Sequence, residues 1–157
     1  MAKVLICYYS QTGNTEKMAQ IITDVMKEAD LSVDLKRVED TKVDDLPDYD
    51  CIVMGSPTYY GSMAWPIKKL LDESIKYHGR LKGKVGGAFS SAANVGGGNE
   101  TTILNILNAL LIHGMIIQGD HRGDHYGPVA IEFPDDRAQE CCKQYAQNLA
   151  GLVRKLF

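Results

Sequence analysis

The stretch Ser10-Gln11-Thr12-Gly13-Asn14-Thr15 separates an apolar run, Val4 to Tyr8, from a segment with helical periodicity that begins near Glu16. A short apolar run of this kind is typical of a strand that is buried on both faces. The apolar residues that follow recur at the spacing of one helix face, namely Met18, Ile21, Ile22, Val25 and Met26. The six residues therefore form the turn between a strand and a helix.

This turn has the composition of an anion-binding site. The first amides of a helix have no partners within the helix, and the helix dipole favours negative charge at this end. The turn adds three hydroxyls and the Asn14 amide, and it contains no Lys or Arg. It matches neither the GxxxxGK[ST] pattern of a P-loop nor the GxGxxG pattern of a dinucleotide-binding turn. We expect it to bind a phosphate through hydroxyl and backbone hydrogen bonds.

A simpler interpretation of the same residues stays open at this point. Ser, Thr and Asn are preferred at helix N-caps, where a side-chain oxygen accepts from a helix amide, and such a cap needs no ligand. One cap uses one side chain, however, whereas this turn offers several.

The rest of the chain alternates between strand-like and helix-like segments. Further strands are predicted at residues 32–37, 51–55, 85–89 and 115–118. Further helices are predicted to begin near Pro66, at Asn99 as a capping residue, and at Asp135, the last of these extending to about Phe157. A brief extended piece is expected at 129–131. Such alternation predicts an α/β fold with a parallel sheet and helices on both faces.

Three polar or glycine-rich loops follow the strands of this predicted sheet. They span residues 10–15, 56–61 and 90–98. Because the carboxyl ends of parallel strands meet at one edge, the three loops are expected to converge there, where open α/β sheets bind their ligands. The sequence therefore predicts a site for a planar, phosphorylated ligand.

Composition sets the outer limits. The 157 residues fit a single domain over 1–157, and 45% apolar with 24% charged residues is ordinary globular composition. A net charge of −3 gives no basic field for nucleic acid, and no apolar run is long enough to span a membrane, so we expect a cytoplasmic protein. The four cysteines form no CxxC pair and are expected to be reduced, mostly core residues.

Several motifs resemble those of known proteins. The turn 10–15 resembles the [ST]-x-T-G-x-T phosphate loop of flavodoxins, in the expected place after the first strand. Other segments are similar to the flavodoxin-like NAD(P)H:quinone oxidoreductases once named tryptophan-repressor-binding proteins, namely Gly55-Ser56-Pro57-Thr58, Phe89-Ser90-Ser91, Gly96-Gly97-Gly98, Glu100-Thr101-Thr102-Ile103, His113-Gly114-Met115 and Tyr126-Gly127. The resemblance implies a flavodoxin-like three-layer sandwich with a five-stranded parallel sheet in the order 2-1-3-4-5.

The resemblance also implies the cofactor FMN. The residues expected to bind it are Ser10, Gln11, Thr12, Gly13, Asn14 and Thr15 around the phosphate, Pro57, Thr58, Tyr59, Tyr60 and Gly61 along the isoalloxazine, and Ser91, Ala92, Ala93, Asn94, Gly96 and Gly97 at the pyrimidine end. His113 matches a histidine that contacts the cofactor in the quinone reductases. As an alternative, His113 is a helix C-terminal residue favoured by the dipole. We name no catalytic residue.

Two functions follow from this resemblance, and a third interpretation is weaker. The first is a single-domain FMN electron carrier, which would serve redox partner proteins. The second is an NAD(P)H:quinone oxidoreductase that transfers two electrons, and a homo-oligomer is left open. A flavodoxin-like binding module with an unused site is disfavoured by the intact hydroxyl-rich turn. His121 and His125 lie in a glycine-containing loop without rigid geometry, so we expect no metal site.

Overall fold

The sheet is the centre of the fold. The computed structural model describes residues 1–157. The main strands lie in the order β2-β1-β3-β5-β6, all parallel, which confirms the expected order of five strands. Their bounds are β1 (Lys3–Tyr8), β2 (Ser32–Arg37), β3 (Cys51–Tyr59), β5 (Val85–Ala92) and β6 (Ile116–Ile117).

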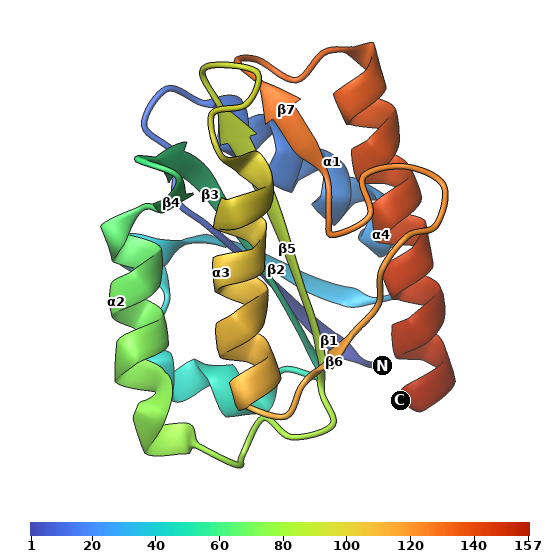
Figure 1. Cartoon of the computed structure of the whole chain (residues 1–157). Helices are drawn as coiled ribbons and strands as arrows, with labels where there is room; N and C mark the ends of the chain where they lie inside the picture. The colour runs from blue at the N-terminus through green and yellow to red at the C-terminus, as the bar shows by residue number, and fades with distance from the viewer.

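Two short strands extend the sheet beyond the predicted five. β4 (Ser62–Met63) pairs antiparallel with the end of β3, so that β3 and β4 form a tight hairpin. β7 (Val129–Ile131) pairs in parallel with the end of β5 and confirms the extended piece expected there. Both additions lie toward the carboxyl end of the sheet, where they enlarge the edge that carries the three polar loops (Figure 1).

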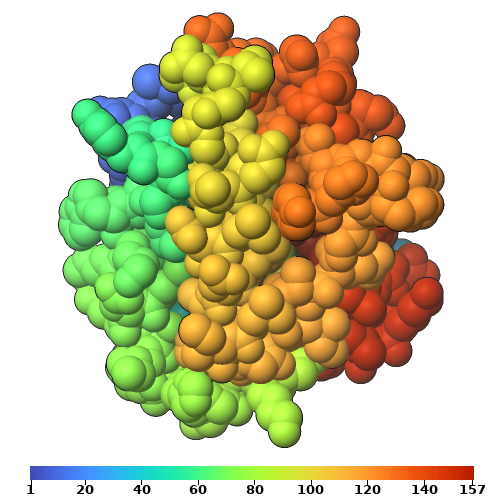
Figure 2. Space-filling model, viewed as in Figure 1, coloured from blue at the N-terminus to red at the C-terminus, as the bar shows by residue number.

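Helices cover both faces of the sheet, as expected. α1 (Asn14–Glu28) and α4 (Asp136–Leu156) cover one face, whereas α2 (Trp65–Glu73) and α3 (Asn99–Ile112) cover the other (Figure 1). Three 3-10 turns complete the connections, namely η1 (Val38–Asp40), η2 (Val43–Asp48) and η3 (Ser74–Tyr77). In the space-filling view, α3 runs down the exposed front between α2 and the orange segment that follows it (Figure 2). None of the helices has the length and apolar character that crossing a membrane would require.

Each face of the sheet has its own apolar core. The core under α1 and α4 contains 21 buried residues, and the core under α2 and α3 contains 17. Because alternate residues of the central strands point to opposite faces, Val4 and Ile6 belong to the first core and Leu5 and Cys7 to the second. The near-continuous apolar sequence of β1 is thus explained by burial on both sides.

The cysteines are all free, as expected from their spacing. Cys7, Cys51 and Cys142 are buried, and burial raises the pKa of Cys7 and Cys142 to about 12. These thiols are therefore protonated packing groups at neutral pH. Cys141 is half-buried beside Arg137, and burial again raises its pKa.

Two of the predicted helix starts differ in how they are capped. The helix expected from Asp135 begins at Asp136, and Asp135 is its cap, since its carboxylate accepts from the Ala138 amide at 2.8 Å. Asn99 was expected to cap α3, but the cap residue is Gly98, and no side chain caps this helix. The Asn99 amide donates instead to the Ala130 carbonyl at 3.2 Å. Asn99 therefore joins α3 to β7 rather than satisfying its own helix.

Candidate functional site

A cleft of about 260 Å³ lies at the carboxyl ends of β1, β3 and β5. The residues that line it are Ser10, Gln11, Thr12, Asn14, Thr15, Pro57, Thr58, Tyr59, Ser91, Ala92, Ala93 and Glu132. All except Glu132 belong to the set singled out in the sequence. Three segments that lie far apart in the chain therefore meet around one hollow, as the parallel topology requires. The loops expected at 56–61 and 90–98 begin later than predicted, because β3 continues to Tyr59 and β5 to Ala92.

The start of α1 has no side-chain cap. The cap residue is Gly13, which has a left-handed backbone with φ 97°, and no side chain accepts from the amides of the first turn. The Ser10 hydroxyl accepts instead from the Gly13 amide at 3.1 Å, which shapes the loop before the helix. The simple capping interpretation of this turn is therefore wrong. The first helix amides keep their capacity to bind an anion.

Hydroxyl groups tie the start of α1 to the end of β5. The Thr15 and Ser91 hydroxyls lie 2.8 Å apart, and both residues are buried. Deeper in the site, the Thr58 hydroxyl lies 3.0 Å from that of Ser90 and accepts from that of Thr102 at 3.2 Å. These contacts hold the starts of α1 and α3 and the ends of β3 and β5 in a fixed relation, so that the cleft is formed before any ligand binds.

A positive charge lies behind the first loop rather than inside it. The Arg37 guanidinium donates to the Ser10 carbonyl at 2.6 Å and covers the Tyr8 ring, with 5.6 Å between the guanidinium carbon and the ring centroid. Arg37 ends β2 directly opposite Tyr8, which ends β1. Arg37 is not among the residues predicted for the site, because its proximity follows from strand register, which the local sequence pattern does not give.

Tyr60 and Gly61 form the turn between β3 and β4. Tyr59 pairs with Ser62, and the two central residues have φ values of 50° and 77°, as in a type I′ hairpin turn. Tyr60 is fully exposed. Its left-handed backbone is unusual for a residue with a large side chain. The Tyr59 hydroxyl donates to the Gln11 side chain at 3.0 Å, which links this hairpin to the first loop.

Replacing Tyr60 by asparagine is expected to raise the free energy of unfolding of the ligand-free protein by about 1 kcal/mol, because Asn tolerates the left-handed region and Asn-Gly suits this turn. Urea unfolding measures the difference. Tyr126→Asn makes the same chemical change at an exposed residue that lacks a positive φ, and no gain is expected there. A stability of Tyr60→Asn at or below that of the wild type would contradict the proposed backbone strain.

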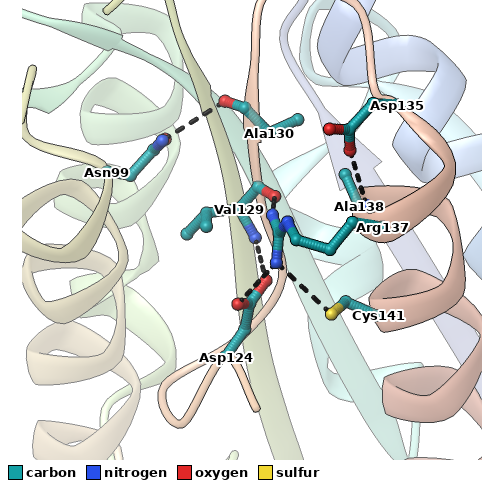
Figure 3. Close-up of polar contacts among 8 residues, drawn as sticks. All are labelled: Asn99, Asp124, Val129, Ala130, Asp135, Arg137, Ala138 and Cys141. Carbon is teal, nitrogen blue, oxygen red and sulfur yellow. Dashed lines mark hydrogen bonds and ion pairs between the residues drawn. The ribbon is translucent and has the colours of Figure 1, made fainter. Parts of the chain in front are cut away.

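Glu132 is the cleft residue that the sequence analysis did not find. It follows β7, and its amide donates to the Ala92 carbonyl at 2.7 Å. Asp124 and Arg137 hold β7 in place: the Asp124 carboxylate accepts from the Val129 amide and from Arg137, each at 2.9 Å, and Arg137 donates to the Val129 carbonyl at 2.7 Å (Figure 3). Glu132 therefore lies at the cleft because β7, which it follows, pairs with β5. Only an extended piece was predicted for this strand.

The remaining predicted residues lie in the same loops but do not line the cleft. Asn94, Gly96 and Gly97 continue the loop from Ala93 toward α3, with the Gly97 amide donating to the Asn94 carbonyl at 3.0 Å. Gly13, Tyr60 and Gly61 occupy the turns described above. These residues adjoin the lining residues in the chain, and their expected contact with a ligand stays a prediction.

His113 is not brought to this cleft, which corrects the expected cofactor contact. α3 begins beside the cleft and leads away from it over 14 residues, or about 20 Å. At its far end, His113 Nε2 lies 2.7 Å from the Ser74 hydroxyl and its ring lies near that of His78. The alternative, a histidine at a helix C-terminus, agrees with this position.

Burial, together with the charge of nearby His78, lowers the pKa of His113. The folded protein therefore binds this proton more weakly than the unfolded chain, in which the pKa is about 6.5. The contribution of His113 to the free energy of unfolding is therefore fully present above pH 6.5 and is lost as the pH falls below about this value and through the lower pKa of the folded state. We expect chemical unfolding between pH 7 and 5 to show a weaker loss of stability in His113→Gln than in the wild type. Equal pH dependence in the two proteins would contradict this assignment.

An open parallel sheet, with a hydroxyl-rich turn and an uncapped helix at its carboxyl edge, defines a phosphate-binding α/β protein. The flavodoxin family model matches residues 6–102, which is more than half of the chain. The chain belongs to the flavodoxin family.

Relatives carry two different names. An NAD(P)H dehydrogenase (quinone) of Nitrobacter winogradskyi is 41% identical over 145 residues, which cover 78% of this chain and 73% of that protein. A flavodoxin of Clostridium saccharobutylicum is 32% identical over 162 residues, which cover 99% of both proteins. Among solved structures, a flavodoxin from the domain Archaea has a TM-score of 0.79 at 27% identity and covers 97% of this chain and 99% of that chain. The names of these relatives therefore divide between flavodoxin and NAD(P)H dehydrogenase (quinone).

Proposed function

We propose that this chain binds FMN in the cleft and acts as an electron carrier. Flavodoxins bind FMN, and the donor set of the cleft suits that molecule. The observation that carries the proposal is the uncapped start of α1, which faces a hollow lined with hydroxyl groups. A phosphate would satisfy the amides that the chain itself leaves free.

Each part of the cleft has a role in this proposal. Ser10, Thr12 and Thr15, with the amides of the α1 start, would hold the phosphate. Tyr59 and Tyr60 would border the flavin ring, where an aromatic side chain is able to stack. The loop of residues 91–97 would offer backbone groups to the other end of the ring. FMN itself supplies the redox chemistry when it is bound, and the protein contributes position and electrostatic environment.

The cleft needs no basic residue to hold a phosphate. Arg37 lies behind the Ser10 carbonyl, and no Lys or Arg lines the hollow, whereas Glu132 does. Hydrogen bonds from neutral groups would therefore provide most of the phosphate affinity. We expect the affinity for FMN to depend only weakly on salt, since screening acts chiefly on exposed charges.

A second candidate is an NAD(P)H:quinone oxidoreductase. The observation that favours it is the 41% identity to a protein of that name, although the flavodoxin relative matches this chain over a larger share of both lengths. The carrier would exchange electrons with redox partner proteins, and the enzyme would bind NAD(P)H and a quinone in turn.

An anaerobic titration of the FMN-loaded protein distinguishes the two functions. NADH or NADPH is added first and dithionite afterwards, and the visible absorbance of the flavin is followed. A carrier is not expected to be reduced by NADH or NADPH. It is expected to accept electrons from dithionite in two resolved steps. Rapid bleaching by a nicotinamide in one step would favour the oxidoreductase, and failure to bind FMN would overturn both.

A further inference from the structure

The Tyr60–Gly61 turn is attached to the start of α3 by side-chain hydrogen bonds. The Thr101 hydroxyl donates to the Gly61 carbonyl, with 2.6 Å between the oxygens, and it lies 2.9 Å from the carbonyl of Gly98. A hydroxyl has one proton, and the shorter distance identifies Gly61 as its main acceptor. One turn further along α3, the Asn105 amide donates to the Ser62 hydroxyl at 2.9 Å. Two successive turns of the helix therefore hold the hairpin.

The backbone of Gly98 allows this close approach. A Cβ at Gly98 would lie 2.7 Å from Gly61 Cα and 3.0 Å from the Thr101 hydroxyl oxygen, so that any larger residue would push the hairpin off the helix. Gly98 also has a left-handed backbone, with φ 109°. The helix start and the hairpin are thus fitted to each other, and the contact with Thr101 is not an incidental surface hydrogen bond.

We propose that Thr101 is a positioning residue of the flavin site, whose hydroxyl fixes the Gly61 peptide with its carbonyl bound to α3. The proposal rests on the function proposed above. Thr101 is exposed and does not line the cleft, so it acts through the turn and not by touching a ligand within it. The turn carries Tyr60 at its tip. It directly follows Tyr59, which lines the cleft.

A fixed Gly61 carbonyl has a consequence for flavin reduction. A reduced flavin carries a proton on N5 that the oxidised flavin lacks, and hydrogen bonds to ring nitrogens tune its potentials. While the Thr101 hydroxyl donates to it, the Gly61 carbonyl is held toward α3, and one of its two lone pairs is already used. Thr101 therefore influences the balance between single-electron and paired-electron transfer, which is the property that separates the two candidate functions.

The attachment is tested first without flavin. We compare the wild type with Thr101→Val, which keeps the shape but loses the donor, and with Thr101→Ser, which keeps the hydroxyl. Amide hydrogen exchange in residues 59–62 is expected to be at least about threefold faster in Thr101→Val, as for the loss of one net hydrogen bond, and unchanged in Thr101→Ser. Equal exchange in all three proteins would overturn the proposal.

The second measurement uses the FMN-loaded proteins. In Thr101→Val, the separation of the two one-electron midpoint potentials is expected to increase by the equivalent of about a threefold to tenfold change in the equilibrium constant between the redox levels. Thr101→Ser is expected to keep the wild-type separation. Unchanged potentials in Thr101→Val, or an equal change in both variants, would overturn the proposal while FMN binding stands. Loss of FMN binding by the wild type would instead overturn the proposed function.

Discussion

Gly55→Ala is expected to lower the free energy of unfolding by about 3 kcal/mol, at the upper end of the usual cost of overpacking a core. A Cβ at Gly55 would overlap the ring of Phe89, which is fully buried and lies directly opposite on the adjacent strand β5. The ring packs in the core under α1 and α4, where close packing leaves it little room to move. The strain would arise in the middle of β3, two residues before Pro57, the first residue of this strand that lines the cleft.

Urea or thermal unfolding of the two proteins measures this effect. Gly151→Ala is the matched control, since it makes the same change at a helical residue in α4 where a Cβ would have no neighbour within 4 Å. The control is expected to gain about 0.5–1 kcal/mol from helix propensity. If the free energy of unfolding of Gly55→Ala lies within about 1 kcal/mol of the wild-type value, the Phe89 ring is able to shift and the packing argument is wrong.

Periodicity in the sequence was sufficient for most of the fold. The apolar run of β1 and the helical spacing in α1 and α4 are strong local signals, and the structure has these elements near the predicted bounds. The strand order came from the resemblance to flavodoxins, since periodicity does not specify which strands are neighbours. β4 has only two residues, and a pattern of period two cannot be detected over that length.

The site was predictable where it depends on topology. Parallel strands bring the loops that follow them to one edge, so Ser10, Thr58 and Ser91 were expected together and do lie around one cleft. Arg37 and Glu132 were not predicted. Their positions near the cleft depend on how β2 pairs with β1 and how β7 pairs with β5, which the sequence pattern does not specify. His113 was misplaced because sequence similarity alone does not tell which end of α3 faces the ligand.

The cap of α1 illustrates why local rules fail at functional sites. Ser10 and Thr12 precede this helix and Asn14 begins it, and each is of a type that makes a good N-cap, yet Gly13 occupies the cap position and the helix amides stay free. Gly in place of Ser, Thr or Asn at this position leaves on the order of a few tenths of a kcal/mol of capping stability unused. Such a local loss is expected where a ligand takes the place of the cap.

Thr12→Ala combined with Thr15→Ala is expected to weaken FMN binding by about 2–4 kcal/mol, because each lost hydroxyl removes a hydrogen bond to a charged phosphate. Fluorescence titration should show the dissociation constant rising by about 30-fold to 1,000-fold. The Thr15 hydroxyl also forms a hydrogen bond with that of Ser91. The free energy of unfolding of the FMN-free variant is therefore measured together with its FMN affinity. Thr12→Ser with Thr15→Ser keeps both hydroxyls and serves as the control.

Riboflavin separates the two roles that these threonines could have. It has the same ring as FMN but no phosphate, so its affinity should be nearly equal in the wild type and in the double alanine variant. A parallel loss of riboflavin affinity would mean that the Thr15–Ser91 contact supports the cleft as a whole. Unchanged FMN affinity would contradict the role of the Thr12 and Thr15 hydroxyls in binding the phosphate, and would leave the uncapped amides of α1 as its main anchors.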